Sequence, residues 1–137
     1  MFILKKILNA SNNCAEPIRM LTDPEHSYIR GGLLRVSNDG TMVNISSGEM
    51  PTHVSLQKLS KNEARTVLCY KITRDMIFEA RLNAIPYESL IGKNIEIAIA
   101  GGHSIALTGS EVNGVATIYS LGSAINEGDN VLVYFNN

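Results

Sequence analysis

Residues 64–82 read ARTVLCYKITRDMIFEARL, and this stretch decides the fold class. Successive side chains of an extended chain point to opposite sides, so apolar residues at every second position form one face of a strand. Such alternation is present on both sides of a short polar turn at residues 73–75. The apolar faces comprise Leu68, Tyr70 and Ile72 before the turn and Met76, Phe78, Ala80 and Leu82 after it. We therefore predict a half-buried β-hairpin here.

Similar strand patterns extend from about Arg30 to Phe135. Ser37-Asn38-Asp39-Gly40 separates two apolar runs, and Asp-Gly favours a tight hairpin because both residues tolerate a positive φ. One short helix is expected at Pro86–Ile91, which Gly92 would end. Further strands are predicted at residues 53–58, 95–99, 104–108, 115–119 and 130–135. The sequence thus predicts an all-β fold, a small β-barrel or a sandwich-like domain.

The first 29 residues differ from the rest, and we expect an extended amino-terminal arm at residues 1–29 followed by a β-barrel domain at residues 30–137. Residues 1–8 are mostly apolar, with Phe2, Leu4 and the Ile7-Leu8 pair, and are too short for a stable isolated helix, so they form either an edge strand or a docking strip. We favour an arm that is mobile in the free subunit and becomes ordered against a neighbouring subunit or a larger surface. The expected partner-binding residues are Phe2, Ile3, Leu4, Ile7 and Leu8.

Composition indicates one small domain. The chain has 137 residues, of which 45% are hydrophobic and 18% charged, enough for one continuous core. A formal net charge of -1 and a pI near 6.3 provide no overall positive field for a phosphate backbone, so no nucleic-acid partner is expected. Lys5-Lys6 follows the short apolar start, whereas a secretory signal has the reverse order, so export is not expected. No apolar stretch is long enough to predict a membrane partner.

Few residues suggest chemistry. His26, His53 and His103 lack metal-site spacing, and Cys14 and Cys69 are predicted to be free, buried thiols. Strand pattern follows the glycine pair at 101–102, whereas a phosphate-binding loop opens a helix. We therefore expect no enzyme and no catalytic, metal-binding or cofactor-binding residues.

Two alternatives stay open. The first is a small barrel that binds single-stranded nucleic acid or oligosaccharide by stacking on aromatic side chains in a basic groove. Tyr70 and Phe78 are more simply explained as core residues, which weakens this alternative. The second, an enzyme using His53 or His103 with a carboxylate, ranks below it. The residues that motivate the first are Lys58, Lys61, Arg65, Lys71, Arg74 and Arg81 with Tyr70, Phe78 and Tyr119.

With the strands placed, the chain resembles the head-decoration (cement) proteins of tailed bacteriophages. The resemblance spans roughly residues 28–135 and does not match the amino-terminal segment residue by residue. Its motifs consist of strand and turn patterns that many small β-proteins share. They are Gly31-Gly32-Leu33-Leu34 through Gly40-Thr41, then residues 50–55, 65–70 and 75–80, and Gly128-Asp129 with the apolar run to Phe135.

The resemblance implies a compact β-barrel-like protein that binds the outer surface of a viral capsid and stabilises the shell. It implies the major capsid protein as partner and a homotrimer as the assembly, with the arm ordering against the capsid. The expected location is the exterior of the virion, after synthesis in the host cytoplasm.

Overall fold

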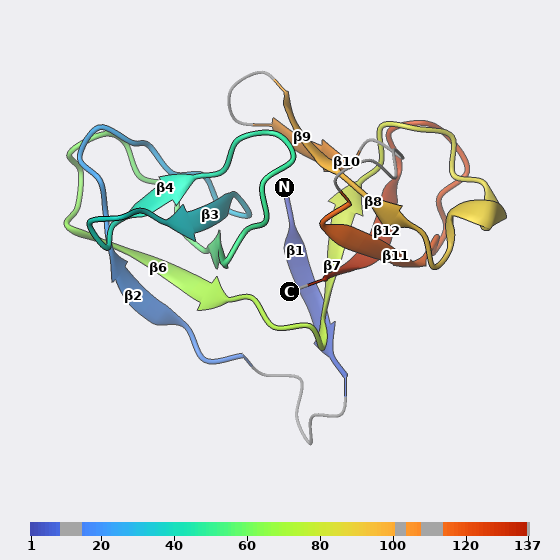
Figure 1. Cartoon of the computed structure of the whole chain (residues 1–137), viewed down its shortest axis with the longest axis horizontal. Helices are drawn as coiled ribbons and strands as arrows, with labels where there is room; N and C mark the ends of the chain where they lie inside the picture. Colours follow the sequence, from blue (N-terminus) through green and yellow to red (C-terminus); the bar gives the residue numbers. More distant parts are fainter. Residues whose placement is uncertain (9–14, 101–103, 108–113, 137) are drawn as a thin grey trace.

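The computed structural model describes residues 1–8, 15–100, 104–107 and 114–136 and shows an all-β fold (Figure 1). Two antiparallel five-stranded sheets and one two-stranded sheet make up the described strands. Sheet A contains, in spatial order, β1 (Ile3–Ile7), β7 (Met76–Arg81), β12 (Asn130–Phe135), β11 (Ala116–Ser120) and β8 (Asn94–Ile95). Sheet B contains β2 (Ile18–Leu21), β6 (Thr66–Lys71), β5 (His53–Ser55), β3 (Leu33–Val36) and β4 (Met42–Asn44). β9 (Ile97–Ala100) pairs with β10 (Ser104–Leu107).

The all-β prediction is confirmed, but neither five-stranded sheet closes into a barrel. The predicted short helix is a single 3₁₀ turn, η1 (Glu88–Leu90). All three residues of β5 are buried, including the polar His53 and Ser55. The reason is position, because β5 lies between β6 and β3 in the middle of sheet B.

The predicted hairpin at residues 64–82 is wrong in its pairing. Both strands and the turn are present, and the Met76 N–H donates to the Thr73 carbonyl at 3.2 Å. However, β6 belongs to sheet B and β7 to sheet A, so the turn is a corner between sheets. The fully buried face of β6 carries Val67 and Cys69 rather than Leu68 and Tyr70. A local pattern specifies strand and turn, but not which strand lies alongside.

The predicted hairpin around Asp39-Gly40 is confirmed, because β3 pairs with β4. Gly40 has a φ of +84°, the left-handed conformation that glycine adopts without steric cost. The Asp39 carboxylate accepts hydrogen bonds from the Ser37 hydroxyl and from the Thr41 hydroxyl and amide. These bonds favour the ionised form and lower the pKa of Asp39, with the Ser37 hydroxyl contributing most.

The main core lies between the inner faces of the two sheets. Phe78 and Phe135 from sheet A pack edge to face, with ring centroids 5.4 Å apart. Leu33 and Val54 contribute from sheet B, and Ile97 contributes from β9. Each of these side chains is almost completely buried.

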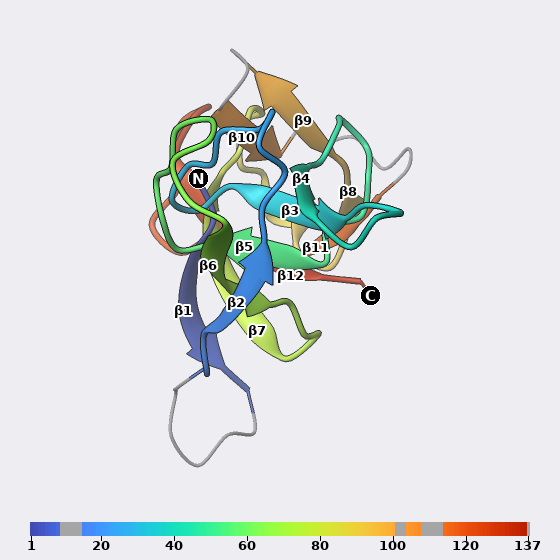
Figure 2. The same cartoon turned by 90° about the vertical axis from the view of Figure 1, so that its left-hand side faces the viewer.

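A second, smaller cluster lies on the other face of sheet B. It contains Tyr28, Leu34, Met42 and Val67, all fully or almost fully buried. Since Leu33 packs in the main core and Leu34 in this cluster, β3 has both faces covered. Figure 2 looks onto this side of the molecule, with β2 crossing in front of the sheet.

The edges of sheet B meet at one end. Thr22, just after β2, forms an isolated parallel bridge with Met42 of β4. The Tyr28 hydroxyl lies at this seam, donating to the Met42 carbonyl at 2.6 Å and accepting from the Asp23 N–H at 2.9 Å. Desolvation is the largest cause of the raised pKa of Tyr28, which keeps this phenol protonated.

The segment expected to be an arm belongs to the folded body in its described parts. β1 pairs antiparallel with β7 at one edge of sheet A, and β2 pairs antiparallel with β6 at one edge of sheet B. Figure 1 shows β1 and β7 near the middle of the molecule, with sheet B on the left and the rest of sheet A on the right. Of the two alternatives for residues 1–8, the structure thus shows the edge strand.

Candidate functional site

Of the five predicted partner-binding residues, Phe2 is a core residue. Its side chain is 2% exposed, and its ring centroid lies 5.5 Å from that of Phe135. Its N–H donates to the Gly31 carbonyl at 2.9 Å, and the Gly31 N–H donates to the Ser55 carbonyl at 2.7 Å. These bonds tie the start of β1 to sheet B. Phe2 therefore anchors the segment and is not accessible to a partner.

The other four predicted residues divide by strand face. Leu4 and Ile7 are partly buried and pack against the main core. Leu8 is also partly buried, and its N–H donates to the Asp75 carbonyl at 2.8 Å. Ile3 faces outward and is 43% exposed. Of the predicted set, Ile3 is the side chain that a partner would reach.

Two lysines accompany Ile3. The pairing of β1 with β7 is irregular between Leu4 and Lys6, which marks a β-bulge at Lys5. The Lys5 ammonium lies 3.4 Å from the Glu79 carboxylate, an exposed ion pair with a small effect on stability. Glu79 also accepts a hydrogen bond of 3.0 Å from the Asn130 side chain.

Lys6 crosses the outer face of sheet A. Its ammonium lies 5.0 Å from the ring centroid of Tyr119, within the range of a cation–π interaction. Tyr119 lies at a second irregularity, in the pairing of β11 with β12. The strands of these residues are separated by β7 and β12, so the Lys6 stem and the Tyr119 ring together bridge this distance. Ile3, Lys5, Lys6, Glu79 and Tyr119 are called the β1 surface below.

The β1 surface is hollowed on both sides. A cavity of about 290 Å³ lies between β1 and sheet B, where Arg30, Ser55 and Tyr70 are among its lining residues. A more open groove of about 600 Å³ lies on the other side, where Lys5, Glu79 and Asp129 meet residues 122–124. Backbone hydrogen bonds from Ile125 and then Asn126 lower the pKa of Asp129, so this wall of the groove stays anionic near neutral pH.

The described histidines do not form a reaction centre with a carboxylate. His53 is 5% exposed, and its Nδ1 lies 2.8 Å from the Thr52 hydroxyl. Desolvation, and then the charge of Lys71, lower the pKa of His53, so its ring is neutral at pH 7. His26 Nε2 lies 3.9 Å from Asp23, too far for a hydrogen bond. His103 and the glycine pair at 101–102 lie outside the described residues.

Cys69 is buried, and its Sγ lies 3.7 Å from the Ile18 carbonyl. Burial raises the pKa of this thiol to about 11, so it is protonated and unreactive at neutral pH. This agrees with the predicted free, buried thiol at this position. Cys14 lies outside the described residues.

In the described part of the chain, no three His, Cys, Asp or Glu side chains come together as a metal site requires. None of the helices described there is long and apolar enough to cross a membrane.

The aromatic residues of the nucleic-acid alternative are mostly inside the protein. Phe78 is fully buried, and Tyr70 is partly buried and packs against the main core. Tyr119 is exposed, but its ring carries the Lys6 ammonium. The basic residues lie on both sheets, with Arg81 ending β7 and Lys71 ending β6. The described basic side chains and aromatic rings therefore do not form a continuous groove.

Comparisons of the chain with protein-family models, with curated proteins and with solved structures found no match.

Sequence reasoning missed two contacts that shape this site. The first is the close approach of the chain start to Gly31, where a Cβ would lie 3.0 Å from both Phe2 N and Phe2 O. The Gly31-Gly32 pair was the available signal, because adjacent glycines allow close backbone contact. The second is the Lys6–Tyr119 pair, for which sequence gave no signal because its residues are joined only by the sheet order.

Proposed function

We propose that this protein is a non-enzymatic structural protein that binds the outer surface of a viral capsid and stabilises the shell. The resemblance to phage head-decoration proteins supplies the partner, the major capsid protein, and the homotrimeric assembly. The observation that carries the proposal is the β1 surface, where the exposed Ile3 and two lysines lie on an edge strand whose outer side has no paired strand among the described residues. The contact with the shell is made here.

An edge strand suits this role because its outer backbone groups are free to pair with a strand of another chain. Long flat edges also pair without selectivity, and natural proteins prevent this with bulges and lysines. β1 has both, a bulge at Lys5 and the adjacent Lys6. Docking is then selective for a partner that covers Ile3 and offers acceptors to the two ammonium groups.

The anchoring of β1 suits a cementing role. Phe2 packs against Phe135 of sheet A and bonds through Gly31 to Ser55 of sheet B. A load applied at the β1 surface is therefore shared by both sheets. This differs from the mobile arm expected from sequence, in which binding alone would order the segment. Here the strand is preformed, and less ordering entropy opposes binding.

The test uses heads of a tailed bacteriophage prepared without their decoration protein. Wild-type protein should co-sediment with these heads and raise the temperature at which they release DNA. Ile3→Asp combined with Lys6→Glu should weaken attachment by about tenfold or more, because it places charge at the apolar contact and reverses a cation. Val36→Asp is the matched control, since Val36 is 41% exposed and lies on β3 of sheet B.

Two results would refute the proposal. One is failure of the wild-type protein to attach to the heads. The other is equal attachment of the β1-surface variant and the wild type, which would leave the contact elsewhere. Circular dichroism of each variant checks that the fold is intact, as expected for changes at exposed positions.

The alternative function, binding of single-stranded nucleic acid or oligosaccharide, rests on Tyr119 and Lys6, an aromatic ring and a cation on one open sheet face. Fluorescence anisotropy with labelled single strands tests it. We expect weak binding, since a chain of net charge -1 releases few counterions. Submicromolar, salt-sensitive binding that is lost in Tyr119→Ala would favour the alternative.

A further inference from the structure

The two ends of the molecule differ in shape and charge. Three apolar side chains are exposed around η1, namely Ile85 at 50%, Tyr87 at 61% and Ile91 at 48%. Within seven residues this is a concentrated apolar surface, unlike scattered exposed residues, which need no explanation. Glu88 is exposed in the middle of it. Residues 85–91 are called the knob.

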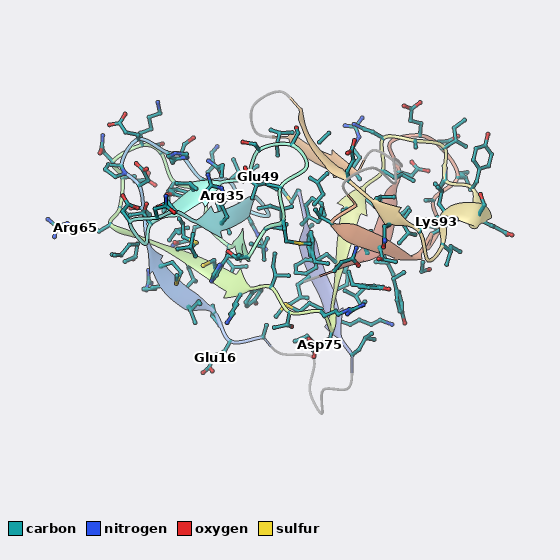
Figure 3. The ribbon with its side chains drawn as sticks, viewed as in Figure 1. Glu16, Arg35, Glu49, Arg65, Asp75 and Lys93 are labelled. Carbon is teal, nitrogen blue, oxygen red and sulfur yellow. The ribbon has the colours of Figure 1, made fainter. Side chains whose placement is uncertain are left out.

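The opposite end is hollowed. A groove of about 650 Å³ is lined by residues of β2, of the turn before β6, and by Pro24 and Thr41. Leu21, 57% exposed, and Ala64 give it apolar walls, and Arg65 stands at its rim. Figure 3 shows Arg65 pointing away from the body at one end of the long axis, and Figure 1 shows η1 at the other end.

Charge complements these shapes. Residues 83–137 contain five acidic residues and one basic residue, whereas residues 1–82 contain eight acidic and eleven basic residues. Glu88 on the knob and Arg65 at the groove are both exposed, and among the described residues neither side chain has an ion-pair or hydrogen-bond partner. Glu63 also lines the groove, but its carboxylate lies 3.4 Å from the Ser60 N–H, within the turn.

We infer that copies of this chain bind one another head to tail, with the knob of one copy in the groove of the next. Tyr87 and Ile91 would cover Leu21 and Ala64, and Glu88 would pair with Arg65. A contact between two different surfaces leaves one knob and one groove free in each dimer, so assembly continues to a closed ring or a chain. This inference rests on the self-assembly included in the proposed function and names its contact, but it is tested on the isolated protein, whereas the capsid role is tested by attachment to heads.

The first experiment measures the mass distribution of the full chain by sedimentation velocity over a range of concentrations. Tyr87→Ser should weaken self-association by about tenfold or more, because an interface aromatic residue is lost. Leu21→Ser should do the same from the groove side. Ile125→Ser, which removes an exposed apolar side chain outside both surfaces, should change little. A wild-type chain that stays monomeric at every concentration would overturn the inference.

Mixing separates a head-to-tail contact from a symmetric one. Tyr87→Ser keeps its groove and Leu21→Ser keeps its knob, so an equimolar mixture contains one intact knob–groove pair. At a concentration at which each variant alone is monomeric, the mixture should therefore form dimers and stop there. If the mixture stays monomeric while the wild type associates, the contact is of another kind and the inference is wrong.

Charge reversal tests the Glu88–Arg65 pair. Glu88→Arg and Arg65→Glu should each weaken association, and the double variant Glu88→Arg/Arg65→Glu should restore it, because the pair is rebuilt with the charges exchanged. Added salt should weaken the wild-type contact through the same pair. A double variant that associates no better than the single variants would overturn this pairing.

Discussion

Sheets A and B both have five strands but protect their edges differently. In sheet B the edge strands β2 and β4 meet at the Thr22–Met42 bridge, and the Tyr28 hydroxyl completes the seam. In sheet A the edge strands are separated by β7, β12 and β11. One edge, β8, has only two residues, and the other, β1, has a bulge and two lysines.

The difference indicates where a partner strand is able to bind. Sheet B joins its two edge strands at the Thr22–Met42 bridge, whereas in sheet A no described strand pairs with the outer side of β1. The open strand remains fixed because alternate residues have separate tasks, with Phe2 and Leu4 packed inward and Ile3 facing out. Anchoring and recognition are therefore combined in one short strand.

Phe2→Ala should have the largest effect on the anchoring of β1. Loss of a fully buried phenylalanine side chain should lower the free energy of unfolding by about 3–5 kcal/mol. Urea denaturation measures the change, and Ile3→Ala on the other face of β1 should have a much smaller effect. Equal stability of Phe2→Ala and the wild type would mean that the segment is detached, as the sequence first suggested.

Gly31→Ala tests the link between β1 and sheet B. Gly31 and Gly48 have φ values of +77° and +82°, so alanine at either should cost about 1–2 kcal/mol from backbone strain. A Cβ at Gly31 would also meet Met1 and Phe2, whereas a Cβ at Gly48 would meet no atom within 4 Å. Gly31→Ala should therefore cost about 1–3 kcal/mol more than Gly48→Ala. Identical losses in thermal denaturation would refute the contact.

Tyr28→Phe tests the seam of sheet B. It removes the hydroxyl that bonds to both the Met42 carbonyl and the Asp23 N–H, at an expected cost of about 1–3 kcal/mol. Tyr87→Phe is the control, since this tyrosine is largely exposed. Hydrogen exchange should also quicken in β2 and β4 while β12 is unaffected. Uniform quickening would show that the two sheets do not differ in this way.

The smallest expected effect is a pH dependence from His53. The pKa of its buried imidazole lies below the ordinary value of 6.5, so the unfolded chain binds more protons in acid than the folded one. The stability that His53 contributes is present above pH 6.5 and is lost as the pH falls through the lower, folded pKa. The denaturation midpoint of His53→Gln should change less between pH 7 and pH 5 than that of the wild type. An equal change in both proteins would show that His53 does not cause the pH dependence.

Much of the fold was predictable because it follows from local physics. Asp39-Gly40 specifies its own hairpin through a positive φ and local hydrogen bonds. Alternation located β6, β7 and β12 within a few residues. The lateral order of the strands was not predictable, because the turn at residues 73–75 fits a hairpin and a corner between sheets equally well. A small barrel or a sandwich-like domain was expected, and the two five-stranded sheets are not closed into a barrel.

The candidate site was predictable only in outline. The apolar character of residues 1–8 indicated burial, but the identity of the surface that buries them depends on β7 and Phe135, far along the chain. Phe2 was therefore predicted as a docking residue and is an anchor. Ile3 could not be separated from Leu4 without the register of the β1–β7 pairing.

The packing of Phe2 on Phe135 has a consequence for synthesis. Ribosomes add roughly 5–20 residues per second, so β1 leaves the ribosome seconds before its ring partner is made. Its lateral partner β7 arrives about midway through that interval, and sheet B needs only residues up to Lys71. Sheet B is therefore able to form while the chain is still growing. Sheet A and the shared core must wait for β12, and contacts of such long sequence separation form slowly.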